Sequence, residues 1–264
     1  MSTGHDSEGQ LDLFEGGAEH TWSYSRLKSL RRCPLEYKVR WLSDQHSLFE
    51  PGHIDVQAGR LLHHIIREYY RSPANAEPYQ LLLKAYHKLA PHASEWKDDL
   101  QGENRALAAL QLFAYSKAAT LRAAALEVAC KARISETSFV GQADLIYEIP
   151  GSPTAYGILE FKLNDVEVRV DDPAERFLQC LIYYAGLPAQ FRSSTKAMGI
   201  YIFDTGMLLE AEIDRALLNK AFSIVETALQ SANGPEFPAR INPFCKSCGY
   251  QTLCPAYSSS LKRR

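Results

Sequence analysis

Two acidic side chains and a lysine lie in neighbouring stretches that have the pattern of β-strands. Asp144 lies in GQADLIYEI, and Glu160 and Lys162 follow in ILEFK. Because strand side chains alternate between faces, Glu160 and Lys162 are predicted to share a face, opposite Phe161. The same alternation places Asp144 on one face of its strand, from which it would meet them across the pairing. The residues expected to share that face with Asp144 are Gln142, Ile146 and Glu148.

This combination of side chains suits phosphodiester hydrolysis. Two carboxylates near one point favour a hard divalent cation such as Mg²⁺ or Mn²⁺. A lysine beside the cation could orient a water molecule and stabilise the charge that develops on a phosphate. An E-x-K tripeptide alone is usually a surface salt bridge, so the prediction depends on its position in an apolar strand after a second apolar strand that carries Asp144.

Further polar residues are expected near these strands. His63 lies four residues after Gly59 in a predicted helix, and a neutral histidine could complete a metal site. Gln179 and Tyr183 are four residues apart in another predicted helix and therefore share a face. They could position a nucleic-acid backbone near the metal, although each of these residues alone would also fit ordinary packing.

The elements that would position these residues follow from periodicity and from helix and turn signals. Residues 1–20 are predicted to be a flexible acidic leader, and residues 21–264 a single domain. A helix is expected over 24–32 with Ser23 as its N-cap, and a short helix from Pro34 to about Trp41. We expect a loop over 43–57, a helix over 59–71, and a helical insertion over about 72–127.

The second half of the chain indicates a sheet. Two strands are expected from about Val128 to Ile149, and the third carries Glu160 after a break at 150–153. Asp172 begins a predicted helix, two more strands flank the turn at Asp204-Thr205-Gly206, and a helix covers about 214–230. This order predicts an α/β core with a mixed sheet flanked by helices, together with a helical lobe.

The charge distribution allows a nucleic-acid partner. The net charge of the 264 residues is −2, but five acidic residues lie in the leader, and 26 acidic residues remain against 29 basic ones. Basic side chains gather in the first predicted helix, where Arg26, Lys28, Arg31 and Arg32 are candidates for DNA binding, the alternative being a solvated face. Without an apolar run of 18 residues or a signal-peptide pattern, we expect no membrane span and a cytoplasmic protein.

Six short segments appear in the order of a known family: YSRLKSLRRCPLEY, GRLLH, GQADLI, LEFK, QCLIYY and CKSCGYQTLC. Together they resemble the RecB-like branch of the PD-(D/E)XK nucleases, especially its iron–sulfur members, the CRISPR-associated exonucleases and AddB-type nuclease domains. The resemblance implies a restriction-endonuclease-like core. It also implies that His63, Asp144, Glu160 and the Phe161 carbonyl bind the metal, that Lys162 is catalytic, and that Gln179 and Tyr183 form the family's Q-x-x-x-Y motif.

Four cysteines match the iron–sulfur members. Cys245, Cys248 and Cys254 lie in the C-terminal segment, about 238–257, and no further Cys or His follows them. A fourth ligand must come from far away, and the family's position for it is Cys33. We therefore expect a [4Fe–4S] cluster, with Zn²⁺ as the alternative. Cys130 and Cys180 are expected to be buried structural residues.

The sequence thus predicts a metal-dependent DNA nuclease, an exonuclease acting on single-stranded or exposed DNA ends in DNA processing, repair or CRISPR and other defence. One alternative is a DNA-binding adaptor subunit that uses the fold for assembly with partners of a CRISPR adaptation, recombination or defence complex. The intact set of site residues argues against that alternative. A structural protein held together by zinc is a third possibility.

Overall fold

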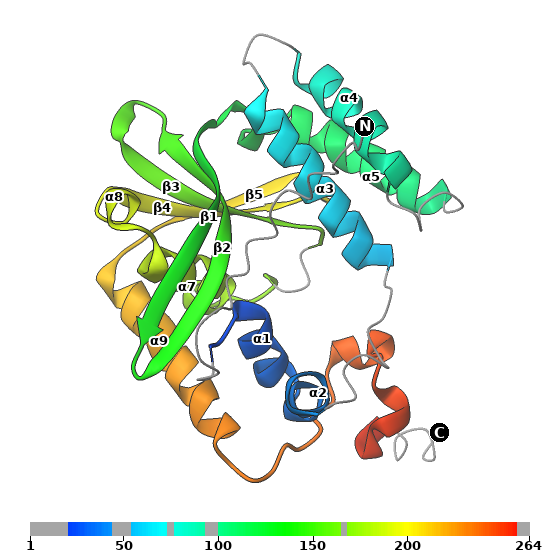
Figure 1. Ribbon diagram of the computed structural model, residues 1–264, viewed down its shortest axis with the longest axis vertical. Coiled ribbons are helices and arrows are strands. Elements are labelled where there is room, and N and C mark those ends of the chain that lie inside the picture. The colour runs from blue at the N-terminus through cyan, green and yellow to red at the C-terminus, as the bar shows by residue number, and fades with distance from the viewer. Residues whose placement is uncertain (1–20, 44–53, 73–76, 93–99, 165–167, 258–264) are drawn as a thin grey trace, which may run out of the picture.

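The chain forms a five-stranded mixed sheet covered by helices on both faces (Figure 1). The computed structural model describes residues 21–43, 54–72, 77–92, 100–164 and 168–257. The leader predicted for residues 1–20 lies outside this part of the chain. In the described residues no helix is long and apolar enough to cross a membrane.

The sheet order follows the order of the strands along the chain. Its members are β1 (Arg122–Ile134), β2 (Thr137–Ile149), β3 (Ser152–Lys162), β4 (Thr195–Ile202) and β5 (Met207–Glu212). All neighbouring pairs are antiparallel except β3 and β4, which are parallel. The parallel pair requires a crossover, and this is made by α6 (Pro173–Arg176), α7 (Leu178–Gly186) and α8 (Ala189–Arg192). The predicted mixed sheet is therefore confirmed.

Each face of the sheet has its own hydrophobic core. On one face, α1 (Tyr24–Arg32), α7 and α9 (Arg215–Ala232) pack residues such as Leu27, Leu181 and Val225 against the strands. On the other face, α3 (Ile54–Arg71), α4 (Pro78–Leu89) and α5 (Leu100–Ala114) bury Leu62 and Phe113 against the same sheet. Figure 1 shows the two helical layers on opposite sides of the strands.

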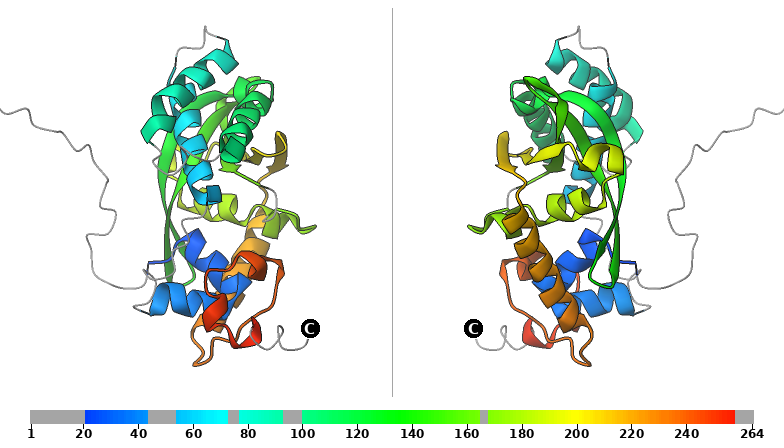
Figure 2. Two further views of the ribbon diagram at one scale, coloured as in Figure 1. Left: turned by 90° about the vertical axis from the view of Figure 1, so that its right-hand side faces the viewer. Right: turned by 90° about the vertical axis from the view of Figure 1, so that its left-hand side faces the viewer.

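The two ends of the described chain lie side by side. After α1, the chain continues through α2 (Pro34–Tyr37) and a π-helical turn, Lys38–Leu42. The C-terminal segment contains short 3₁₀ helices at Pro243–Ser247 and Gln251–Leu253, and both views of Figure 2 show it beside α1 and α2. Asn242 Nδ2 donates to the Arg32 carbonyl at 3.1 Å, so side-chain contacts join segments about 200 residues apart in the sequence.

Most predicted elements are present, and helix caps explain several boundaries. The Ser23 hydroxyl accepts a hydrogen bond from the Arg26 amide at the start of α1, and Asp214 caps α9 in the same way. The expected helix after Asp172 is interrupted at Phe177, whose ψ of 17° separates α6 from α7.

Two expectations about boundaries were wrong. The helix expected from Gly59 begins at Ile54, within the segment expected to be a loop, so Gly59 lies inside α3. The helical insertion was expected to reach residue 127, but α5 ends at Ala114, and β1 begins at Arg122 after a 3₁₀ turn over Ala118–Thr120. Alanine favours helices, but residues 122–126 become strand because the sheet supplies hydrogen bonds: Arg122, Ala123, Ala125 and Leu126 pair with β2.

Candidate active site

Strand β3 presents Glu160 and Lys162 on one face, as the alternation predicts. Ile158, two residues before Glu160, belongs to the core with α7, whereas Leu159 and Phe161 belong to the core with α3 and α5. Glu160 is 1% exposed although it is a carboxylate. A buried carboxylate needs polar partners, and its neighbours supply them.

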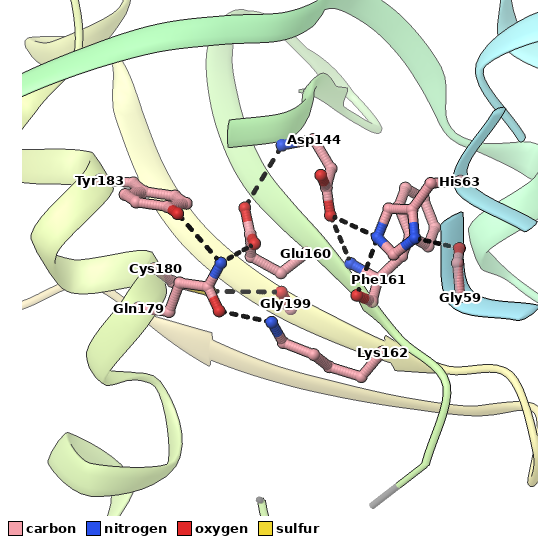
Figure 3. A network of polar contacts seen from close by, with 10 residues as sticks. All are labelled: Gly59, His63, Asp144, Glu160, Phe161, Lys162, Gln179, Cys180, Tyr183 and Gly199. Carbon is pink, nitrogen blue, oxygen red and sulfur yellow. Dashed lines mark hydrogen bonds and ion pairs between the residues drawn. The ribbon is translucent and has the colours of Figure 1, made fainter. Parts of the chain in front are cut away.

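Asp144 reaches the site through a break in the regular alternation of β2. Ala143 and Ile146 pack in the same core, whereas Leu145 packs in the other, so the expected grouping of Ala143 with Leu145 by simple alternation does not hold. The paired residues of β2 and β3 extend only to Leu145 and Leu159. Beyond this pair the Asp144 carboxylate accepts from the Phe161 amide at 2.9 Å, and the Asp144 amide donates to Glu160 Oε1 at 3.3 Å (Figure 3).

His63 approaches the carboxylates from α3. Its Nδ1 lies 2.7 Å from the Gly59 carbonyl one helical turn earlier, which fixes the proton on Nδ1 because a carbonyl can only accept. Its Nε2 then lies 3.3 Å from Asp144 Oδ2 and 3.1 Å from the Phe161 carbonyl oxygen. A neutral Nε2 carries a lone pair, so all three atoms would be electron donors. Three electron-donating atoms so close together repel one another unless a proton or a cation lies between them.

The pKa values of His63 and Asp144 shift in the directions expected when a protonated histidine faces an ionised carboxylate. Loss of hydration disfavours the charged form of His63, but the Asp144 carboxylate and the Gly59 carbonyl together outweigh it, and the pKa of His63 is raised. Loss of hydration likewise acts against ionised Asp144, but His63 and the Phe161 amide lower the pKa of that carboxyl. The two side chains remain 36% and 24% exposed, so a ligand from solvent can reach them.

The donor set at this point fits a hard divalent cation. A carboxylate oxygen of Asp144 and the Phe161 carbonyl oxygen are ligand types used for Mg²⁺ and Mn²⁺, whereas Nε2 of His63 is a ligand type of transition metals and favours Mn²⁺ of the two. Among the described residues, no three His, Cys, Asp or Glu side chains gather in a way that could hold a metal ion. The candidate cation site therefore consists of the side chains of His63 and Asp144 and the Phe161 carbonyl. The Glu160 carboxylate lies next to it and accepts hydrogen bonds from the Asp144 amide and from Gln179.

Glu160 and Lys162 are joined through Gln179 of α7. Gln179 Nε2 donates to Glu160 Oε2 at 2.5 Å and to the Tyr183 hydroxyl at 3.2 Å, and its Oε1 accepts from Lys162 Nζ (Figure 3). Burial and the Asp144 charge raise the pKa of Glu160 well above its ordinary value, which Lys162 opposes. The structure therefore brings together all six side chains that were predicted for this site, together with the Phe161 carbonyl.

Two contributions were not foreseen from the sequence. Tyr24 of α1 places its ring 5.9 Å from Lys162 Nζ, within the range of a cation–π contact. Gly141 of β2 leaves room for Tyr183, since a Cβ there would lie 2.3 Å from the tyrosine ring. The glycine in GQADLI was the available signal for close approach, but its partner could not be known without the fold.

The six cysteines divide into two groups. Cys130 and Cys180 are buried, as predicted, and burial raises the pKa of Cys130 to about 12. Cys33, Cys245, Cys248 and Cys254 are partly exposed and near the joined chain ends. Burial raises the pKa of Cys248, and the nearby Glu36, Cys33 and Cys245 raise it further. Within the described residues these thiols do not form a metal-binding group, so the predicted iron–sulfur cluster is not shown.

The basic residues predicted to bind DNA have partners within the protein. Arg26 lies over the rings of Trp22 and Tyr37. Arg31 forms an ion pair with Glu175, and Arg32 forms one with Glu36. The charges of Arg31 and Arg32 are thus partly neutralised, and DNA binding by these residues and Lys28 stays a prediction.

Comparison with known proteins agrees with this arrangement. The PD-(D/E)XK nuclease superfamily matches residues 21–255. A crystal structure from Eubacterium rectale, provisionally described as an exonuclease, has a TM-score of 0.53 at 11% identity, covering 90% of this chain and 87% of that one. The structure of SSO0001 has a TM-score of 0.37 at 14% identity, covering 92% of this chain and 89% of that one. No curated protein matches the chain.

The sheet is mixed, has helices on both faces, and carries two carboxylates and a lysine on adjacent strands. This arrangement fits a restriction-endonuclease-like core. With nearly the whole described chain matched, the protein belongs to the PD-(D/E)XK nuclease superfamily. The likeness to the Eubacterium rectale structure supports the fold alone, because the identity is low. The RecB-like iron–sulfur branch remains a prediction from the sequence.

Proposed function

We propose that this protein is a Mg²⁺- or Mn²⁺-dependent deoxyribonuclease that removes nucleotides from exposed, single-stranded DNA ends. The observation that carries the proposal is the convergence of His63 Nε2, Asp144 Oδ2 and the Phe161 carbonyl oxygen beside the Glu160–Gln179–Lys162 chain. Membership of a nuclease superfamily supports hydrolysis of nucleic acid. The preference for DNA and for ends is inferred from the motifs that resemble RecB-like exonucleases.

Each residue has a defined task in this proposal. His63, Asp144 and the Phe161 carbonyl would hold the cation, with Glu160 beside them, and the cation would supply Lewis acidity toward the phosphodiester. Gln179 holds Lys162 by accepting from its ammonium group, and the ammonium group would orient the attacking water and stabilise the charge that develops on the phosphate. Because Gln179 also donates to Glu160, it positions the lysine and the carboxylate together.

A cleavage assay with end-labelled single- and double-stranded DNA tests the proposal. With Mn²⁺ or Mg²⁺, the wild type is expected to shorten single strands from their ends, and Lys162→Ala is expected to reduce the rate by about 100-fold or more. Lys196→Ala is the matched control, because Lys196 is an exposed strand lysine whose Nζ donates to a local carbonyl, that of Ser193. Its rate should equal that of the wild type.

The outcomes separate the alternatives. Equal cleavage by wild type and Lys162→Ala would contradict the active-site assignment. DNA binding by the wild type without cleavage would favour an adaptor subunit of a recombination or defence complex. Cleavage of circular single strands would contradict a requirement for ends.

We also propose that Cys33, Cys245, Cys248 and Cys254 hold a [4Fe–4S] cluster when iron is supplied. The support is the spacing of the cysteines and the proximity of Cys33, Cys245 and Cys248 at the joined chain ends. Backbone amides of Arg240 and Asn242 donate to the sulfur atoms of Cys33 and Cys245, at 3.4 and 3.3 Å. The role proposed for such a cluster is structural, since it would connect the beginning of the domain to its end.

A further inference from the structure

An arginine lies one helical turn beyond His63 on α3. Arg67 and His63 are four residues apart and therefore lie on the same side of the helix. Arg67 Nη1 lies 3.2 and 3.1 Å from the two carboxylate oxygens of Glu127 on β1. This pair adjoins the candidate cation site but belongs to none of the motifs that predicted it.

Glu127 has an unusual backbone conformation. Its φ of 51° lies in the left-handed region, although it stands within strand β1 and is not a glycine. Such a conformation costs about 1 kcal/mol or more and often occurs at functional sites. Glu127 stands opposite Asp144, between the pairs Leu126–Leu145 and Val128–Ala143. The irregular backbone of β1 thus lies opposite a proposed metal ligand on β2.

Neighbouring contacts hold this conformation. Gln142 Nε2 donates to the Glu127 carbonyl at 2.9 Å, which fixes the backbone from the facing strand. The strand alternation changes on either side of Glu127, because Leu126 contacts the core of α3 and α5 while Val128 contacts the core of α7. As a result, the Glu127 carboxylate contacts Arg67 of α3 beside the candidate cation site.

The Arg67 guanidinium retains hydrogen-bonding capacity. Within the described part of the chain, Nη1 is the one nitrogen of this guanidinium that contacts Glu127. The side chains of Arg67 and Glu127 remain 26% and 37% exposed, so a ligand can compete for the pair. A guanidinium binds phosphate with two donors, whereas here a single nitrogen serves the carboxylate.

We propose that Arg67 binds a phosphate of the DNA strand next to the one at the cation site, and that Glu127 holds Arg67 in the free protein and competes with that phosphate. This inference rests on the proposed function. In Figure 3, Lys162 and Gln179 lie on the α7 side of the carboxylates and His63 lies on the α3 side. Arg67 follows His63 by one turn of α3, so the proposal puts phosphate contacts on both sides of the carboxylates. Because Glu127 competes with the phosphate, a substitution of Arg67 should weaken DNA binding, whereas a substitution of Glu127 should strengthen it.

The test measures binding of a short fluorescein-labelled single-stranded oligonucleotide, with Ca²⁺ present, in the Lys162→Ala protein so that cleavage does not interfere. Arg67→Gln is expected to weaken binding by about tenfold and to reduce the slope of log Kd against log salt by about 1, because one phosphate contact is lost. Glu127→Gln is expected to tighten binding several-fold, because Arg67 is released and a negative charge is removed. The double variant should bind like Arg67→Gln.

A purely structural ion pair gives a different result. Both single variants would then weaken binding together, in proportion to lost thermal stability, and the salt slope would stay unchanged. That result overturns the inference. Arg67→Lys keeps the charge without the guanidinium fork and should bind with intermediate affinity, and Glu127→Gln supplies the opposite-sign test even if Arg67→Gln folds poorly.

Failure of this inference is distinguishable from failure of the proposed function. If the Lys162→Ala protein and the wild type bind no DNA and the wild type cleaves none, the nuclease proposal fails. If the wild type cleaves DNA and the Lys162→Ala protein binds it, but Arg67→Gln and Glu127→Gln leave affinity unchanged, only the phosphate contact fails.

Discussion

Cys130 and Cys180 lie in the core between the sheet and α7, with 3% and 0% of their surface exposed. Burial raises the pKa of both thiols, so both stay protonated and are poor metal ligands near neutral pH. Cys33 and Cys245 are partly exposed, and each accepts a hydrogen bond from a backbone amide, a contact that also stabilises a metal-bound thiolate.

This difference gives a prediction for individual cysteines. Protein purified without oxygen should contain iron and absorb visible light, and Cys33→Ser should lose most of the iron. Cys130→Ala should keep it, because that thiol lies in the core and is not a proposed ligand. Iron analysis and absorption spectra check this. Zinc in place of iron would contradict the cluster, and unchanged iron in Cys33→Ser would remove that residue from the ligand set.

At the level of elements, helix α7 controls the polar side of the site. It carries Gln179 and Tyr183, and it packs on β1 at its C-terminal glycine. A Cβ on Gly186 would lie 2.7 Å from the backbone nitrogen atoms of Lys131 and Ala132. Backbone atoms of a paired strand cannot yield easily, so this contact sets the distance between α7 and the sheet.

Two glycine substitutions test this packing. Gly186→Ala is expected to lower the free energy of unfolding by about 1–3 kcal/mol through overpacking, and to slow cleavage because Gln179 shifts with α7. Gly59→Ala, inside α3 with open space at its Cβ position, should raise the free energy of unfolding by about 0.5–1 kcal/mol. Urea denaturation measures both values. Equal stability of Gly186→Ala and wild type would show that α7 does not approach β1 so closely.

At the level of the whole molecule, contacts between the chain ends complete the domain. Arg240 Nη1 donates to the Arg31 carbonyl at 2.7 Å, and Asn242 Nδ2 donates to the carbonyls of Arg32 and Arg240. The Asn242 side chain also caps the following 3₁₀ helix by accepting from the Phe244 amide at 2.9 Å. Carbonyl groups at the end of α1 thus find partners in the C-terminal segment.

Removing these contacts should loosen the connection between the ends. Asn242→Ala is expected to lower the free energy of unfolding by about 1–2 kcal/mol, because it removes a cap and leaves the Arg32 carbonyl without this donor. Asn233→Ala, at an exposed position after α9, is the control and should change stability little. Thermal or urea unfolding distinguishes the two. A loss of the same size in both variants would mean that Asn242 does not connect the ends.

Local patterns predicted much of this molecule. The alternation in ILEFK placed Glu160 and Lys162 together, and the caps at Ser23 and Asp214 marked two helix starts. These features depend on neighbours along the chain, whose side-chain directions follow from backbone geometry. The order of the motifs also led to the correct superfamily.

Other features depend on contacts between distant segments. Residues 122–126 joined the sheet against their helical composition because β2 supplies partners for Arg122, Ala123, Ala125 and Leu126. Asp144 reached the site through a change of alternation opposite Glu127, and Arg67 met Glu127 from a helix 60 residues earlier. Composition and spacing could identify the side chains capable of metal-dependent hydrolysis. The strand register and the approach of α3 and α7 established which atoms meet, because those distances come from packing between elements and not from periodicity within one.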